Sequence, residues 1–404
     1  GEKGFAEVIK KDIQPSMEAI ANFTDSLPVS EYHFILYLRD GKAFMETIRS
    51  KDVGWIKKIK TVWENRSLMG GGALEHGNSS FYVLPDFGDT TFTSMIKRVA
   101  LHEFMHIFTP LNLHSEQIGN FDYVDPKMSK HLWLYEGVTE YFANLILLQS
   151  NLITDREFFT QRIRNKISSS SRYPEKKISF TDMSQRVFEK KYGQHYYQVY
   201  QRGAIIGLLL DIEIIRLTNG QKTLKDVVLE LSNKYGSERS FNEETFFDEF
   251  TALVHPDLRQ WFADYVEGTV PLDITGGLSQ IGVNYSKKGK HLVPKRIFRD
   301  YGTKSYFLSM GKYRKIKKVG KKDPIGFEVG DSVNTEILDS LLYDEKGYPR
   351  PEGTQVSIKL KRNGNKLSLP YKIEYKERKY KHRLLLSKDP NDIQSNYYSV
   401  WRSN

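Results

Sequence analysis

The sequence predicts an α+β fold with two domains, a mainly helical domain over residues 1–280 and a β-rich domain over residues 281–404. Three observations predict this division. The chain has 404 residues, which is too long for one hydrophobic core and typical of two or three domains. Long segments with the apolar period of helices lie between residues 91 and 254. From about residue 278 the pattern changes to short alternating segments rich in glycine and lysine, which favours strands.

The first domain is expected to begin with helical segments and a small sheet. Residues 5–28 have the pattern of one or two helices, interrupted near Pro15. Alternating β-branched and aromatic residues predict strands at 31–40 and 79–86. A glycine-rich stretch, residues 67–80, leads into the second of these strands.

Further segments of the first domain have helical apolar spacing. In chain order they are residues 91–108, 130–152, 198–220, 223–236 and 242–254. Pro110 is expected to end the first of them, and the pair Asn219-Gly220 is expected to end the third.

Composition excludes several classes of site. The sequence has no cysteine, which excludes disulfides, thiolate metal sites and cysteine nucleophiles, so any metal must be held by His and carboxylates. No apolar run reaches the length of a membrane span, and no secretory apolar region is visible near the start. Because the sequence begins without Met, we expect a fragment, and we favour an exported bacterial protein over a cytoplasmic one.

The net charge of +10 is unevenly distributed. Residues 286–404 carry 28 Lys and Arg against 13 Asp and Glu, whereas the first 285 residues carry 32 against 37. A basic domain can bind nucleic acid. Here the basic residues alternate with apolar ones, as in VSIKLKRNGNKLSLPYKIEY at 356–375. This alternation is typical of the solvated face of a sheet, so no nucleic-acid partner is expected.

The segment HEFMH, residues 102–106, carries the first candidate site. On a helix, positions i and i+4 lie on the same face, so His102 and His106 can both point at one ion. Glu103 can then reach a water on that ion. The five-residue pattern alone also occurs by chance, so a third ligand has to decide between a metal site and an ordinary helix.

Glu136 is the candidate for that third ligand. A catalytic Zn2+ takes three protein ligands and an open position. Glu136 lies in LWLYEGVTEYF, flanked by apolar residues, and a buried carboxylate needs a metal or a partner charge. An ion pair with Arg or Lys is the alternative. Glu140, one turn on, is expected either to orient a ligand histidine or to lie on the surface, and His114 and His131 are expected to be ordinary histidines.

These motifs together resemble the gluzincin metallopeptidases, and most of all the glycyl aminopeptidase family. HEFMH, LWLYEGVTEYF and YQRG follow one another in the family's order, and GGGALEHGNSS stands where the family has a glycine-rich segment before the metal helix. The resemblance runs from about residue 5 to 265 and continues more weakly to about 380. It implies a thermolysin-like catalytic domain, bound Zn2+ and a PDZ-like C-terminal domain.

The resemblance also implies roles for single residues. Glu75 would hold the free α-amino group of a peptide substrate, with Gly71 and Gly72 lining the site. Tyr200 would stabilise the oxyanion. Tyr196 and Tyr197 lie in the same stretch and remain alternatives for that role. Without the resemblance, Glu75 reads as an exposed residue of a glycine-rich hairpin.

The sequence therefore predicts a zinc-dependent aminopeptidase in which His102, His106 and Glu136 bind the metal and Glu103 is the general base. One alternative is an endopeptidase on the same scaffold. Another is a peptide-binding PDZ protein with a residual peptidase domain. The segments DPIGFEVGDSVNTEI and GTQVSIKLKRNGNKLSLPYKI resemble PDZ strands, but a clear carboxylate-binding loop is missing, so a structural cap is favoured for this domain.

Overall fold

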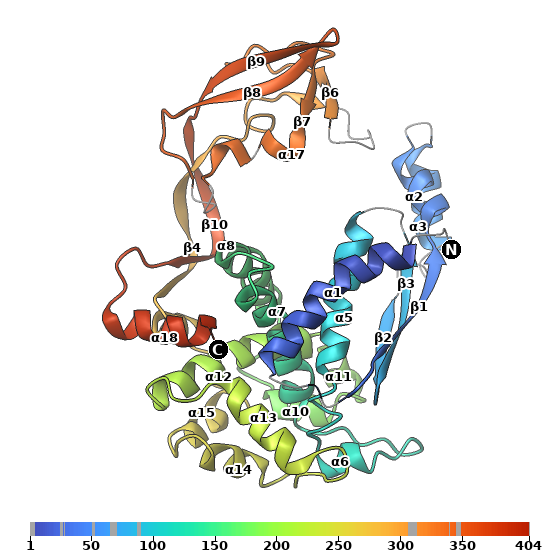
Figure 1. Cartoon of the computed structure of the whole chain (residues 1–404), viewed down its shortest axis with the longest axis vertical. Coiled ribbons are helices and arrows are strands. Elements are labelled where there is room, and N and C mark those ends of the chain that lie inside the picture. The colour runs from blue at the N-terminus through green and yellow to red at the C-terminus, as the bar shows by residue number, and fades with distance from the viewer. Residues whose placement is uncertain are drawn as a thin grey trace. The chain divides into compact units, whose positions relative to one another are not determined.

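Figure 1 shows a computed structural model of the chain. It describes residues 5–24, 27, 29–50, 53–64, 71–86, 90–305, 313–338, 340–344 and 349–403. The chain divides into two compact units, and each contains helices and strands, as expected for an α+β protein. Unit 1 comprises residues 1–286 and 382–404, and unit 2 comprises residues 287–381. None of the described helices is long and apolar enough to cross a membrane.

A three-stranded sheet in unit 1 has the order β1-β3-β2. Strands β1 (His33–Asp40) and β3 (Ser79–Asp86) pair in parallel and confirm the strands predicted at 31–40 and 79–86. Strand β2 (Gly72–His76) pairs antiparallel with β3 and forms an edge of the described sheet. The sequence does not predict β2, because its glycine, histidine and glutamate weaken the alternating apolar pattern.

Helix α1 (Phe5–Phe23) runs through Pro15 as one helix, so the interruption expected at this proline does not occur. Pro15 is exposed, and the proline ring costs the helix one backbone hydrogen bond. Ile13, Ile20 and Phe23 are buried on the two sides of it, and the helix packs against α5 and α7. Burial of this face stabilises the continuous helix. Two short helices follow: α2 (Lys42–Arg49) and α3 (Trp55–Glu64).

Helix α12 (Gln198–Leu217) occupies the middle of unit 1 and is buried on most of its surface. It packs against η1 (Trp133–Val138), α7 (Thr139–Gln149) and α9 (Arg164–Ser170). Asn219 and Gly220 follow its last turn with φ of 51° and 84°, the left-handed conformation that ends helices. The predicted stop is therefore confirmed.

Further helices are described in unit 1, and most of them add buried apolar side chains to its core, whereas the two short ones at 116–119 and 155–157 contain no buried residue. The further helices are α5 (Thr90–Met105), α6 (Glu116–Gly119), α8 (Asp155–Glu157), η2 (Phe158–Ile163), α10 (Phe180–Gln185), α11 (Lys190–Gly193), α13 (Leu224–Tyr235), α14 (Phe246–Ala252), α15 (Leu258–Tyr265) and α16 (Ile274–Ser279). The helices predicted at 223–236 and 242–254 correspond to α13 and α14. The helix predicted at 130–152 is divided between η1, which has the wider turn of a π-helix, and α7.

The chain ends in helix α18 (Asp392–Ser403), which belongs to unit 1, whereas the sequence pattern assigns all of residues 281–404 to the second domain. Trp401 anchors the helix, because its ring is buried against Phe158 and its Nε1 donates to the Tyr141 hydroxyl at 2.8 Å. That hydroxyl donates in turn to the buried carboxylate of Asp211 at 2.6 Å, whose pKa burial raises to about 6. The last helix is thus tied into the core around α7 and α12.

Two strands connect the units. β4 (Val283–Pro294) leaves unit 1, β10 (Tyr375–Leu386) returns to it, and the two pair with each other. The Ser387 amide donates to the Gly282 carbonyl at 2.7 Å, and Tyr285 hydrogen-bonds His382 at 2.8 Å. The pairing is therefore antiparallel, since the residue numbers rise on one strand as they fall on the other.

Unit 2 contains a five-stranded antiparallel sheet of order β5-β6-β7-β8-β9. Asn363 and Gly364 form the turn between β8 and β9 with φ of 51° and 84°, as an Asn-Gly hairpin requires. These short strands confirm the change of pattern expected from about residue 278. The elements are β5 (Lys304–Ser305), β6 (Tyr313–Lys318), β7 (Ser332–Asn334), α17 (Thr335–Leu338), η3 (Ser340–Leu342), β8 (Gln355–Arg362) and β9 (Asn365–Lys372).

Candidate active site

Helix α5 places His102 and His106 next to each other. Apolar residues of the same helix, including Leu101 and Phe104, are buried and fix its orientation. The two imidazole rings have their centroids 4.8 Å apart and are both buried. The helix ends at Met105 rather than at the predicted residue 108, and the His106 amide bonds the Glu103 carbonyl in a tighter turn. The i, i+4 geometry of the two histidines survives this earlier end.

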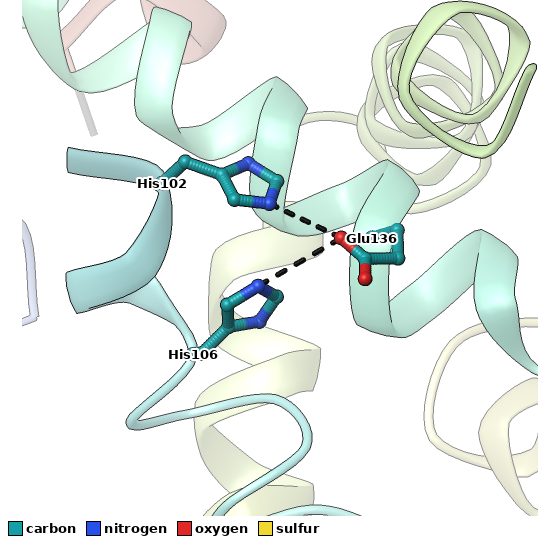
Figure 2. Close-up of side chains that lie close together, drawn as sticks. All are labelled: His102, His106 and Glu136. Atoms are coloured by element: carbon teal, nitrogen blue, oxygen red, sulfur yellow. Dashed lines mark hydrogen bonds and ion pairs between the residues drawn. The ribbon is translucent and has the colours of Figure 1, made fainter. Parts of the chain in front are cut away.

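The third residue of the group, Glu136, comes from η1. Figure 2 shows both histidines pointing toward its carboxylate from the neighbouring segment. Oε2 of Glu136 lies 3.1 Å from Nε2 of His102 and 3.7 Å from Nε2 of His106. One ligand atom from each of the three residues therefore lies within 4.8 Å of the others. We call His102, His106 and Glu136 the metal group, because together they could hold a metal ion. Single π-turns inside helical segments often occur at functional sites, and this one carries the carboxylate.

The other ring nitrogen of each histidine has a partner that fixes the ring. Nδ1 of His102 lies 3.0 Å from Oε2 of Glu140, and Nδ1 of His106 lies 2.8 Å from the carbonyl oxygen of Thr109. Both acceptors favour a proton on Nδ1, so Nε2 of each ring is the atom that could bind a cation at the centre of the group. This arrangement is the usual support of metal-binding histidines.

Charge inside the group is strongly coupled. Burial lowers the pKa of His102, but its hydrogen bonds to Glu136 and Glu140 raise the pKa more, to about 10. Burial raises the pKa of Glu136, and its hydrogen bond to His102 and the charge of His106 shift the net pKa below the usual value. The carboxylates of Glu136 and Glu140 thus stabilise a positive charge between them. A divalent cation bound between the three side chains would supply it.

Glu103 and Glu75 also lie close to His106. A carboxylate oxygen of each, together with a ring nitrogen of His106, lies within 4.8 Å of the others. Burial raises the pKa of Glu103, and the nearby histidines oppose this shift without cancelling it. Two carboxylates this close repel each other unless a proton or a cation lies between them. The structure therefore brings Glu75, which is distant in sequence, to the metal group.

Glu75 is held there by strand β2, on which it pairs with Ser80 of β3. Gly72 is exposed, and a Cβ atom built on it would meet nothing within 4 Å. A Cβ atom on Gly71 would lie 3.0 Å from the Val83 carbonyl oxygen, so of the two glycines only Gly72 offers open space beside the strand. Within the described sheet, β2 pairs only with β3.

Tyr200 lies beside the group, with its ring centroid 5.5 Å from that of His102. Burial and then the charge of Glu136 raise the pKa of Tyr200 far above its usual value, so the hydroxyl keeps its proton and can donate it in a hydrogen bond. Tyr196 hydrogen-bonds Tyr200, and its own pKa is raised by burial and by Glu136. Tyr197 is 64% exposed. Of the three tyrosines, Tyr200 therefore remains the best candidate for the oxyanion donor, and Tyr196 is its hydrogen-bond partner.

The two remaining candidate histidines lie outside the group. His131 is fully buried; its Nε2 hydrogen-bonds the Glu243 carbonyl, and Trp133 Nε1 donates to its Nδ1. Burial lowers its pKa to about 3, so it stays neutral. His114 bonds the Pro110 carbonyl oxygen through Nδ1 at 2.9 Å. Both have structural contacts, as ordinary histidines do.

A residue that the sequence does not point to is Lys166. Its ammonium contacts Oε1 of Glu140 at 2.5 Å. Burial alone would raise the pKa of Glu140, but the charge of Lys166 and the hydrogen bond and charge of His102 outweigh it. The pKa of Glu140 therefore lies well below its usual range. No sequence signal separates Lys166 from Arg164, an exposed basic residue of the same helix.

Two glycines, Gly137 of η1 and Gly203 of α12, set the distance between Glu136 and Tyr200. A Cβ atom on either would lie 2.7 Å from the Cα of the other, so only glycine permits this approach of the helices. Each glycine stands close to a candidate residue, in YEG and YQRG. The motifs contain these glycines, but the sequence alone does not indicate their packing role.

We expect Gly203→Ala to lower the free energy of unfolding by about 1–3 kcal/mol, since overpacking forces the two helices apart. The same movement should displace Tyr200 from the metal group and reduce kcat. Denaturant unfolding and steady-state kinetics measure the two effects. Gly54→Ala is the matched control, because a Cβ atom there meets nothing within 4 Å. Equal stability of the two variants would contradict the close crossing.

Comparison with known proteins points to a family of peptidases. Residues 96–206 match the family model described as M61 glycyl aminopeptidase, a segment that contains every candidate residue except Gly71, Gly72 and Glu75. Among solved structures, an aminopeptidase N family protein from Idiomarina loihiensis is similar, with 17% identity and a TM-score of 0.61 over 99% of this chain and 67% of that chain. At this identity the likeness shows the fold alone. No curated protein sequence matches the chain.

Proposed function

We propose, from the membership of residues 96–206 in the M61 glycyl aminopeptidase family, that this peptidase is a zinc-dependent aminopeptidase. The observation that carries the proposal is the convergence of His102, His106 and Glu136 on one point, with both Nδ1 atoms engaged elsewhere. The family description names glycine, and we extend the proposal to peptides that begin with small residues such as Gly or Ala. The thermolysin-like character of unit 1 is part of the same proposal.

The three side chains fit Zn2+ by their chemistry. Two neutral imidazoles and one carboxylate, without sulfur, form a donor set of catalytic zinc enzymes and leave a coordination position open. Bound Zn2+ supplies a Lewis acid that lowers the pKa of a water and polarises the substrate carbonyl. Glu140 and the Thr109 carbonyl support the ligand rings, as outer contacts of such sites do.

The protein's own residues then handle the proton and the charge. Glu103 accepts the proton of the attacking water and passes it to the nitrogen of the leaving amine, so that one bond to the carbonyl carbon forms and the peptide bond breaks. The raised pKa of Glu103 suits this exchange, because the group both takes and returns a proton. Tyr200, protonated beside His102, donates a hydrogen bond to the oxyanion.

The exopeptidase assignment rests on Glu75. The ammonium group of a free N-terminus carries the positive charge that the pair of Glu75 and Glu103 requires. The exposed backbone at Gly72 lies on the same strand, three residues away, where a peptide could align along the edge of β2. An N-terminus held at Glu75 leaves one residue before the scissile bond, which makes the enzyme an aminopeptidase.

We predict that His106→Ala loses its zinc. Two remaining ligands hold the ion too weakly to survive dialysis against a chelator, and turnover is lost with it. Metal analysis after dialysis measures the zinc content. His114→Ala, which removes a buried histidine outside the group, should keep both zinc and turnover. Full zinc content in His106→Ala would place the metal elsewhere.

Unit 2 is proposed to be a PDZ-like cap rather than a part of the active site, since the candidate residues all lie in unit 1. Because β4 and β10 pair antiparallel where they leave unit 1, residues 287–381 can be replaced by an Asn-Gly turn between Ser286 and His382. We expect the shortened chain to fold and to cleave short amide substrates at close to the parental rate. A folded but inactive product would mean that unit 2 contributes to the site.

A further inference from the structure

We propose that Lys166 is a positioning residue of the metal group. Its ammonium holds Glu140 in the orientation that fixes the ring of His102, and it also binds the backbone carbonyl of Tyr200. The inference rests on the proposed zinc site and deepens it.

The ammonium of Lys166 is buried at a junction of three helices. Lys166 lies on α9, and its side chain is only 8% exposed. Its Nζ contacts Oε1 of Glu140 on α7 at 2.5 Å and donates to the carbonyl oxygen of Tyr200 on α12 at 3.3 Å. A lysine rarely gives up its hydration without partners of this kind. Both partners belong to the candidate active site, and neither is a proposed metal ligand.

Lys166 restricts Glu140 because the two oxygens of that carboxylate have separate tasks. Oε2 accepts from Nδ1 of His102 at 3.0 Å. Oε1 receives Lys166 and, at 3.3 Å, the side-chain amide of Asn144. Among the described residues, Lys166 is the one lysine or arginine that forms an ion pair with Glu140. Without it the carboxylate can rotate about its last bond, and the ring of His102 loses its fixed acceptor.

The contact with Tyr200 has a further consequence. Tyr200 is the proposed oxyanion donor, and its backbone carbonyl is bound to the same ammonium that holds Glu140. The orientation of His102, through Glu140, and the position of Tyr200 therefore both depend on the ammonium of Lys166. A change at Lys166 should affect metal affinity and kcat together, and should change KM less.

The test is the zinc dissociation constant, measured by competition with a chromophoric chelator, of the parent and of Lys166→Met. Removal of an outer support of a metal ligand typically costs 10- to 100-fold in affinity, and we expect a loss of about that size. Lys130→Met is the matched control, because Lys130 is similarly buried but pairs with Glu244, away from the metal group. Its zinc affinity should equal that of the parent even if its melting temperature falls.

A double-mutant cycle with Glu140→Gln separates positioning from general loss of packing. If Lys166 acts through Glu140, Lys166→Met should weaken zinc binding much less in the Glu140→Gln background than in the parent background. Equal losses in the two backgrounds, or parental zinc affinity in Lys166→Met, would overturn the inference. Lys166→Gln, which retains a hydrogen-bond donor, takes the place of the methionine variant in the cycle if that variant does not fold.

If the proposed zinc-dependent function is wrong, the measurements give a different result. In that case the parent itself binds no zinc at the group, and no variant of Lys166 or Glu140 is needed to see it. A parent that binds zinc tightly while Lys166→Met binds it equally tightly would leave the aminopeptidase proposal intact and remove only the role of the lysine.

Discussion

Glu103→Gln is expected to keep its zinc and lose about 10²- to 10⁴-fold in kcat, since general-base catalysis contributes a factor of this order. The amide has the size of the carboxylate but cannot accept the proton of the attacking water. Glu103 is buried beside His106 and is not one of the three converging ligands, so the metal group should survive the change.

Zinc content and single-turnover rates of the variant check this expectation together. Glu249→Gln serves as control, because that carboxylate bonds Tyr235 and Lys234 at a remote position. Turnover within tenfold of the parent would mean that another group activates the water. Loss of zinc along with turnover would leave the role of Glu103 as the base unsupported.

Glu75→Ala should reduce kcat/KM on a free-amine substrate by roughly 10- to 150-fold. A hydrogen bond between an ammonium and a carboxylate in a desolvated site contributes on the order of 1.5–3 kcal/mol, which corresponds to this range. The variant also relieves the repulsion between Glu75 and Glu103, so its stability should not fall.

The informative comparison uses Gly-amide and Ala-amide substrates and their N-acetylated forms. The parent should cleave the acetylated forms poorly, and Glu75→Ala should leave those low rates almost unchanged. Equal cleavage of free and acetylated substrates by the parent would remove the aminopeptidase assignment and favour the endopeptidase alternative. Glu75→Gln, which keeps the volume of the side chain, should lose nearly as much as the alanine variant.

Much of the site can be predicted from the sequence because its chemistry depends on short-range spacing. His102 and His106 are four residues apart, and the helical period alone brings them together. Glu136 requires the physical argument that a carboxylate among apolar residues needs a cation. Glu75 follows only from the resemblance, since its approach to Glu103 depends on how β2 pairs with β3.

Other features depend on contacts that no local pattern encodes. Lys166 is buried because α7, α9 and α12 meet around it, and nothing in its own segment signals this. The sequence pattern places helix α18 in the C-terminal domain, whereas the structure places it in unit 1. The contact that holds it there, Trp401 against Phe158, joins residues far apart in sequence, so no local pattern reveals it. The close crossing of Gly137 in η1 with Gly203 in α12 is likewise a tertiary contact.

An anomalous difference map from crystals of this chain, recorded on both sides of the zinc absorption edge, would show whether zinc binds between His102, His106 and Glu136. We expect one strong peak that is present only above the edge and lies in contact with Nε2 of His102, Nε2 of His106 and a carboxylate oxygen of Glu136. A protein whose amidase activity is intact but whose map has no peak between these three atoms would contradict the proposed zinc site.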